Sequence, residues 1–207
     1  HPFHYEAGAV AVISGVTIRL VQGEAGFLTP ALLRAAVRGA NVHHAPPRLL
    51  SVENTANRGG GRVLSVEKNT ALLQAARQLG LNLHLDGARI WNAAAALNCE
   101  EHALSEAYDM VSVCFSKGLG APVGSLVAGR RETIHKARRV RKMLGGGMRQ
   151  VGILAAGALH AVHHHRLRLK EDHVRAMRLW EGLRVAGWEV ERPETNMVYV
   201  VTPDAPG

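Results

Sequence analysis

Cysteine and aromatic residues are scarce in this sequence of 207 residues. Cys99 and Cys114 are its two cysteines, and 4% of its residues are aromatic. The cysteines form no C-x-x-C pair and no His/Cys spacing of a zinc site, which argues against a disulfide framework and a structural metal. We therefore expect a protein of a reducing compartment with no metal centre.

Long apolar runs are also missing. No stretch approaches the roughly 20 residues of a membrane-spanning helix, and the first residues lack the pattern of a signal peptide. We expect a cytoplasmic protein without a membrane partner. The sequence begins at His1, without a methionine, and ends just after an apolar stretch, so we expect it to be an internal piece of a longer protein.

Acidic residues are outnumbered: 17 Asp and Glu stand against 25 Lys and Arg, for a net charge of +8. Such an excess suits nucleic-acid binding, but it also suits an enzyme with an anionic substrate and cofactor. The charge alone does not decide between them. With 47% hydrophobic residues, the chain can bury a substantial core.

Strand-like apolar stretches alternate with helical patterns, which predicts an α/β domain with a mainly parallel sheet. Thr29 and Pro30 are typical of a helix start, and Gly80 is a natural stop for a second helix over 66–79. The expected strands are 17–21, 49–53, 83–85, 110–115 and 125–128.

The pattern changes after Gly129. A basic helix is expected over 131–144 and long helices over 149–184, followed by two short strands of a smaller α+β unit. We therefore expect residues 1–160 to form a large domain and residues 161–207 to form a linking helix and the beginning of a small C-terminal domain.

A carboxylate and an amine follow two neighbouring expected strands. Asp86 and Lys117 each end an apolar run and are each followed by glycine, and open α/β sheets bind ligands at the carboxyl ends of their strands. A lysine forms an imine with an aldehyde, and a carboxylate keeps a pyridine nitrogen protonated. The pair is therefore the minimum set for pyridoxal 5'-phosphate. The alternative is that Asp86 caps the next helix and Lys117 is an ordinary surface residue.

The longer context of this pair resembles the threonine aldolases, a group of fold-type I pyridoxal-phosphate enzymes. The resemblance runs from residue 1 to residue 201. The strings that carry it are Y-E-A-G (5–8), V-E-N-T (52–55), H-L-D-G-A-R (84–89), S-K-G-L-G-A-P-V-G-S (116–125), R-K-M-L-G-G-G-M-R-Q (141–150) and T-N-M-V (195–198). It implies a transferase-like large domain with a mainly parallel, seven-stranded type of sheet flanked by helices. It also implies aldol cleavage of L-threonine or L-allo-threonine into glycine and acetaldehyde.

The same resemblance implies a role for each site residue. Lys117 is the Schiff-base lysine, Asp86 the partner of the pyridine nitrogen, and His1 the histidine that stacks on the cofactor. Arg89 binds the substrate carboxylate or the phenolic oxygen of the cofactor, the alternative being a surface salt bridge. His43 matches the histidine near the substrate β-hydroxyl, where a base starts the cleavage.

The adjacent His44 is barely separated from His43 by sequence. Four further site residues are expected. Tyr5 forms an aromatic wall, Ser116 donates to the cofactor phosphate, and Lys142 and Arg149 are cations beside the glycine triplet 145–147. For Tyr5, ordinary packing is an open alternative. For His43, the alternative is a loop histidine that makes its hydrogen bonds and has no catalytic role.

Several alternatives and partners complete the expectations. A second fold-type I reaction, β-elimination or one like that of serine hydroxymethyltransferase, stays open, as does a non-catalytic basic module. The resemblance implies a homodimer or homotetramer with sites at subunit interfaces, an amino-acid substrate and no nucleic-acid partner. The histidines around 160–173 have no carboxylate or cysteine that completes a metal site, so we expect them to be exposed helix residues.

Overall fold

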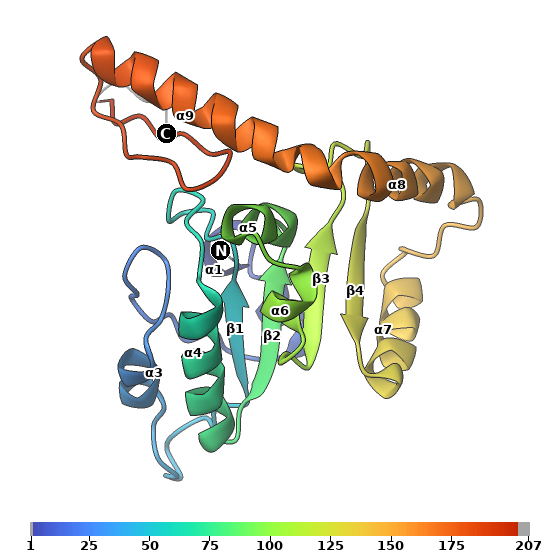
Figure 1. The fold of residues 1–207 in the computed structure, drawn as a ribbon. Coiled ribbons are helices and arrows are strands. Elements are labelled where there is room, and N and C mark those ends of the chain that lie inside the picture. The colour runs from blue at the N-terminus through green and yellow to red at the C-terminus, as the bar shows by residue number, and fades with distance from the viewer. Residues whose placement is uncertain (1, 203–207) are drawn as a thin grey trace.

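A four-stranded sheet in the order β1-β2-β3-β4 forms the centre of the structure, a computed structural model that describes residues 2–202. β1, β2 and β3 run parallel, and β4 pairs antiparallel with β3 at the edge (Figure 1). The expected α/β class with a mainly parallel sheet is confirmed, and the sheet has four strands within the described residues. The strands are β1 (Leu49–Glu53), β2 (Asn82–Gly87), β3 (Met110–Cys114) and β4 (Ser125–Gly129).

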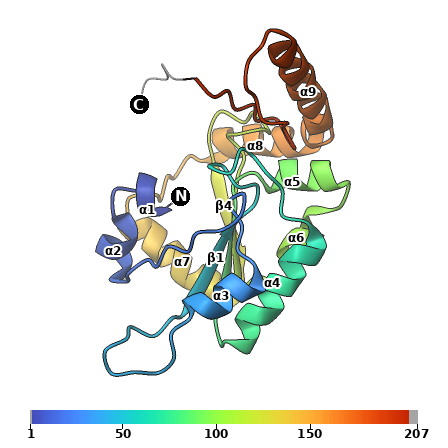
Figure 2. The ribbon, with the colours of Figure 1, turned by 90° about the vertical axis from the view of Figure 1, so that its left-hand side faces the viewer.

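Helices lie on both sides of this sheet, and a helical arm crosses one end of it. Figure 2 shows α4, α5 and α6 on one side and α1, α2 and α7 on the other, and in Figure 1 α8 and α9 cross above the carboxyl ends of the parallel strands. The helices are α1 (Pro2–Tyr5), α2 (Ala9–Ser14), α3 (Pro30–Ala36), α4 (Val66–Gln78), α5 (Ile90–Leu97), α6 (Glu101–Ser105), α7 (Arg131–Met143), α8 (Gly152–His164), the 3-10 turn η1 (Arg166–Arg168) and α9 (Leu169–Val185).

The helix starts follow from local chemistry. The hydroxyl of Thr29 accepts a hydrogen bond from the backbone N–H of Leu32 at 3.2 Å, and Pro30 occupies the first turn of α3. Ser65 caps α4 in the same way through the N–H of Lys68 at 3.3 Å. These caps satisfy backbone donors that a helix leaves unpaired, so the expected start at residues 29–30 is confirmed.

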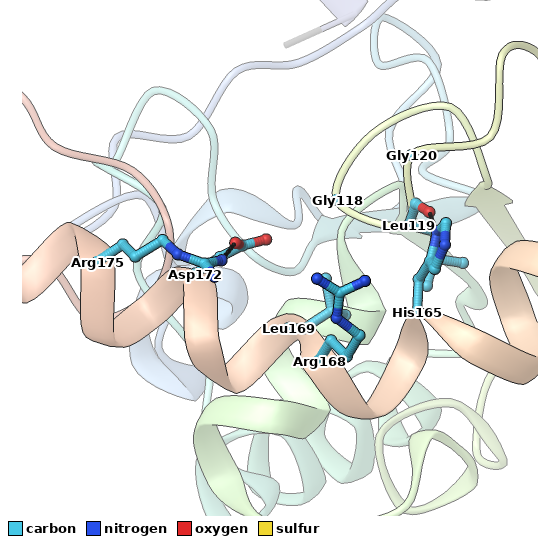
Figure 3. Close-up of a pocket in the computed structure, with 8 residues that line it drawn as sticks. All are labelled: Gly118, Leu119, Gly120, His165, Arg168, Leu169, Asp172 and Arg175. Carbon is cyan, nitrogen blue, oxygen red and sulfur yellow. Dashed lines mark hydrogen bonds and ion pairs between the residues drawn. The ribbon is translucent and has the colours of Figure 1, made fainter.

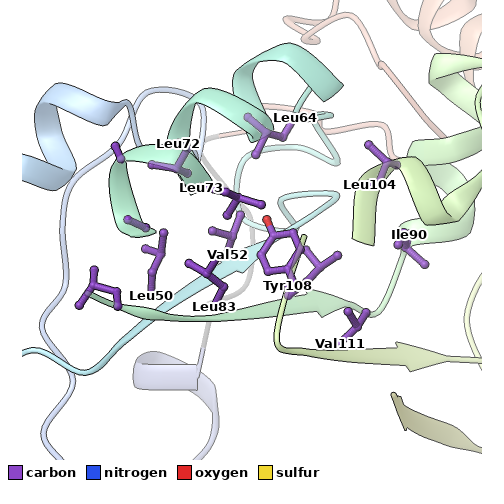
Figure 4. Packing of buried hydrophobic residues seen from close by; sticks show 14 of the residues in the cluster. Leu50, Val52, Leu64, Leu72, Leu73, Leu83, Ile90, Leu104, Tyr108 and Val111 are labelled. Atoms are coloured by element: carbon purple, nitrogen blue, oxygen red, sulfur yellow. The ribbon is translucent and has the colours of Figure 1, made fainter. Parts of the chain in front are cut away.

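The main core lies between the sheet and α4, α5 and α6. Alternate residues of the strands point into it, including Leu50, Val52 and Leu83 (Figure 4), because successive strand side chains face opposite sides of a sheet. Leu85 belongs to the same core. The strand residues between these core positions face the other side, where Ser51 is exposed and His84 and Asp86 are half-buried. This alternation leaves polar strand residues free to form a site at the carboxyl edge.

One expected strand is wrong. Residues 15–23 form a loop rather than the strand expected over 17–21, and Ile18 and Leu20 are 36% and 51% exposed. The segment has β-branched residues, but among residues 2–202 no neighbouring strand pairs with it, and a strand depends on such pairing. The two short C-terminal strands reduce to a single antiparallel bridge between Val190 and Val200.

No helix within residues 2–202 combines the length and the apolar character needed to cross a membrane.

Candidate active site

Asp86 and Lys117 follow neighbouring strands at one edge of the sheet. Asp86 lies near the end of β2, and Lys117 comes three residues after the end of β3. The two strands are parallel, with Asp86 in register with Ser112, so their carboxyl ends point the same way and lie about 4.8 Å apart. The structure therefore brings the predicted carboxylate and amine to the same edge.

Asp86 is half-buried near the end of β2, just before the turn that leads into α5. Its Oδ1 accepts a hydrogen bond from the backbone N–H of Ala88 at 3.1 Å, and its carbonyl accepts one from the N–H of Asn54 at 3.0 Å. Arg89 is the N-cap residue of α5 and is also half-buried. A rigid turn between a strand and a helix thus carries both an anionic and a cationic group.

The loop that carries Lys117 is closed by its own backbone. The N–H of Gly120 donates to the carbonyl of Lys117 at 2.8 Å, and Gly120 has φ 70°, a conformation that favours glycine. Leu119 is fully buried beneath the loop, whereas Ser116 and Lys117 are exposed. The loop is therefore anchored by one side chain while it presents an amine and a hydroxyl at the surface.

Three polar residues beside Asp86 share its face of the sheet. Ser51 and Glu53 lie on β1, and His84 lies on β2; Ser51 Oγ and His84 Nδ1 are 2.9 Å apart. Glu53 is the register partner of Asp86. Sequence reasoning did not propose these residues as site members, although their alternation with core leucines and Val52 is the signal that could have found them.

Electrostatics couple these groups. Burial raises the pKa of Glu53, the charge of Asp86 raises it further, and the nearby Arg89 lowers it in part. Burial lowers the pKa of His84, and the charge of Asp86 works against that shift. Perturbed carboxylates and imidazoles at the carboxyl edge of an α/β sheet are typical of a functional site.

Tyr5 lies at the end of α1, near the loop that follows β1. The guanidinium carbon of Arg58 in that loop is 5.5 Å from the centroid of the Tyr5 ring, a distance typical of a cation–π contact. The predicted aromatic wall is therefore near the carboxyl edge of the sheet, and about half of the Tyr5 side chain is exposed.

His43 lies at the other end of the sheet. It is exposed in the loop that leads into the amino end of β1 (Figure 1), and its backbone N–H donates to Asn41 Oδ1 at 2.9 Å. His44 lies in the same loop, 3.4 Å from the carbonyl of Gly39. A loop that precedes a parallel strand lies opposite the carboxyl edge, so one chain does not bring His43 and Lys117 together.

Lys142 and Arg149 lie at the end of α7 and just before α8, both exposed and on the β4 side of the molecule. His1 lies outside the described residues. Within residues 2–202, no three His, Cys, Asp or Glu side chains form a group that could hold a metal ion.

The fold is of the α/β class, with a mostly parallel sheet flanked by helices, and solved structures of threonine aldolases share it. The solved structure of a threonine aldolase from Leishmania major superposes with a TM-score of 0.84 at 21% identity, covering 97% of this chain and 59% of that one. The family model of the beta-eliminating lyases matches residues 1–205. The chain belongs to the beta-eliminating lyase family.

Two curated relatives are closer in sequence. The chain is 43% identical to low-specificity L-threonine aldolase 1 of Arabidopsis thaliana over 97% of its own length and 58% of the relative's. It is 42% identical to the low specificity L-threonine aldolase of Escherichia coli K12, over 97% of its length and 60% of the relative's. The chain thus spans about 60% of the length of these relatives.

Proposed function

We propose that the protein containing this chain is a pyridoxal-phosphate-dependent lyase that cleaves L-threonine or L-allo-threonine into glycine and acetaldehyde. The observation that carries the proposal is that Asp86 and Lys117 follow neighbouring parallel strands at the same edge of the sheet. The names of the relatives, at 42 to 43% identity, support the substrate.

The residues at this edge fit the cofactor. Lys117 offers an exposed amine for an aldehyde. Asp86 offers a half-buried carboxylate for a pyridine nitrogen, and Arg89 offers a guanidinium for an anionic oxygen. The hydroxyl of Thr55 lies two residues after β1 and is 1% exposed, and its oxygen has no hydrogen-bond partner within residues 2–202. An unpaired buried hydroxyl beside a polar edge is consistent with a site that receives a polar ligand.

When bound, pyridoxal phosphate supplies an aldehyde for the lysine and a ring that takes up the electron pair of the broken bond. Lys117 would hold the cofactor through a bond from Nζ to the aldehyde carbon. Asp86 would keep the ring nitrogen protonated, and Ser116 would donate to the phosphate. Arg89 would bind the substrate carboxylate in a two-pronged contact, which fixes the bond that breaks.

Cleavage needs a base for the β-hydroxyl proton. As that proton leaves, the Cα–Cβ bond breaks, the aldehyde carbonyl forms, and Cα later takes up a proton to give glycine. His43 has the chemistry for this step, but its loop lies at the far end of the sheet from Lys117 within one chain. We therefore propose that His43 acts in the site of a second subunit, in a homodimer or homotetramer.

The other expected residues keep the roles that the resemblance implies: His1 stacks on the ring, Tyr5 walls the substrate side, and Lys142 and Arg149 supply cationic groups from the β4 side. We propose a cytoplasmic location, and residues 1–160 and 161–207 as the large domain and the beginning of the small one.

The test is cofactor loading and product analysis of the intact protein. The wild type is expected to gain a visible absorbance band with pyridoxal phosphate and to release glycine and acetaldehyde from threonine. Lys117→Ala is expected to lose both, while Lys68→Ala, on the exposed side of α4, retains them. A Lys117→Ala protein with a normal band and normal cleavage would end the proposal.

A second reaction is favoured by the family itself, whose description is beta-eliminating lyase. Elimination would release pyruvate and ammonia from a substrate with a β-leaving group, instead of glycine and an aldehyde. Product analysis with serine and threonine therefore distinguishes the two reactions on the same preparation.

A further inference from the structure

The loop that carries Lys117 is held from behind by the C-terminal helices. Leu119, Ala121, Ala161 and Leu169 form a small buried cluster under the loop, separate from the main core. A pocket of about 140 Å³ lies beside it, lined by residues 118–120 and by side chains of the α8–α9 region (Figure 3). The position of the lysine therefore depends on contacts with α8 and α9 as well as on β3.

His165 makes the first of two polar contacts. It is the C-cap residue of α8, half-buried, and its Nδ1 lies 2.7 Å from the carbonyl oxygen of Leu119 (Figure 3). A carbonyl oxygen only accepts, so Nδ1 carries the hydrogen and donates it. This bond fixes the backbone two residues after Lys117.

His173 makes the second contact through Asn92. Asn92 lies in α5, is 1% exposed, and its Nδ2 is 3.2 Å from Nε2 of His173 in α9. The amide nitrogen donates, so Nε2 of His173 accepts and must be unprotonated. Burial lowers the pKa of His173, with the charge of Asp172 acting in the opposite direction, and the lowered pKa favours this state.

Asn92 in turn lies against the residue that follows Lys117. A Cβ atom at Gly118 would lie 2.7 Å from Oδ1 of Asn92 and 3.1 Å from Cδ2 of Leu169. Only glycine fits there without a shift of its neighbours, so the lysine loop, α5 and α9 are in direct contact. Arg89, shortly after Asp86, is the N-cap residue of α5, and Asn92 in α5 therefore links the two halves of the proposed site.

We propose that His165 and His173 are positioning residues that hold Lys117 in place, His165 directly through Leu119 and His173 through Asn92. The inference rests on the proposed role of Lys117 as the cofactor lysine. Neither histidine reaches the reacting atoms in this scheme. Their effect is to fix the loop backbone, so that the amine of Lys117 is presented at the correct distance from the carboxylate of Asp86.

The test compares substitutions that remove each hydrogen bond with substitutions that keep it. His173→Leu removes the acceptor for Asn92, whereas His173→Gln keeps one in its side-chain carbonyl. His165→Leu removes the donor to Leu119, whereas His165→Gln keeps one in its amide. His163→Leu, at an exposed position of α8, is the matched control.

The primary measurement is the rate at which cofactor-free intact protein incorporates pyridoxal phosphate, followed by absorbance. Both Leu variants are expected to load about 10- to 100-fold more slowly, and their kcat for threonine to fall by a similar factor, because misplacement of a reacting group by about 1 Å has such an effect. KM is expected to stay within about twofold, since no substrate contact is lost. The Gln variants and the control are expected to load nearly as fast as the wild type.

Melting temperatures measured alongside separate positioning from folding. Leu variants that load at the wild-type rate overturn the inference, as do Gln variants impaired as much as the Leu variants. If a Leu variant does not fold, Gly118→Ala tests the same contact from the loop side: slow loading supports the inference and wild-type loading overturns it. A wild type that takes up no cofactor refutes the proposed function instead.

Discussion

Leu119 and Leu72 offer a matched test of how the core supports the lysine loop. Both leucines are 0% exposed, Leu72 in α4 within the main core (Figure 4) and Leu119 in the small cluster beneath Lys117. Truncation to alanine removes three buried carbons, which costs roughly 2 to 3 kcal/mol of transfer free energy. The cavity left behind brings the expected loss of unfolding free energy to about 3 to 5 kcal/mol at either site.

The two variants are expected to differ in function although they lose similar stability. Leu119→Ala frees the loop that presents Lys117, so cofactor incorporation should slow by about tenfold or more. Leu72→Ala leaves that loop intact, so loading should stay close to the wild-type rate below its lowered melting temperature. The assay is denaturant unfolding with and without cofactor, together with the loading rate. Equal loading rates in the two variants, at similar losses of stability, would refute the reasoning.

Two further predictions concern buried polar groups. Tyr108→Phe is expected to cost about 1 to 3 kcal/mol of unfolding free energy. The Tyr108 hydroxyl donates at 2.6 Å to Oδ1 of Asn69, and the substitution would leave that buried oxygen without its donor. Tyr199→Phe, at an exposed hydroxyl, is the control in the same denaturant titration, and an equal cost at both sites would contradict the prediction. Glu53→Gln is expected to raise the melting temperature at pH 7. Burial and the charge of Asp86 raise the pKa of Glu53 in the folded protein. The stabilising contribution of the Glu53 carboxyl is therefore present below the ordinary pKa of 4.5 and is lost as the pH rises through the folded pKa. The difference from the wild type should shrink as the pH is lowered below 4.5, and a difference that does not change with pH would refute the stated cause.

The sheet was predictable where local pattern and tertiary pairing agree. Residues 49–53, 83–85, 110–115 and 125–128 combine apolar alternation with flanking turns, and all four lie in strands of the sheet within one or two residues. Residues 17–21 have similar composition but no strand beside them, and composition alone does not provide a partner. The same limit applies to the C-terminal pair, which forms only the bridge between Val190 and Val200.

The sequence predicts the positions of site residues best when they directly follow a strand of the sheet. Asp86 and Lys117 follow parallel strands, so chain direction alone puts them at one edge. Glu53 and His84 share the face of Asp86 through the same alternation along β1 and β2, although no site role is predicted for them. The resemblance suggests His43 as the base, but its position before β1 already places its loop at the amino end of the sheet, opposite Lys117.

This difference separates two kinds of site residue. Asp86 and Arg89 are fixed by a strand, a turn and a helix that are bonded to one another, and Asn92 joins that helix to the lysine loop and to α9. A catalytic group needs placement to within a fraction of an ångström, and such continuous packing can provide it within one chain. Within residues 2–202, the hydrogen bonds of His43 and His44 go to nearby residues of their own loop, Asn41 and Gly39. In the proposed oligomer the precision of this loop would come from packing against another subunit, so dilution below the dissociation constant of that oligomer should reduce cleavage before it reduces cofactor binding at Lys117.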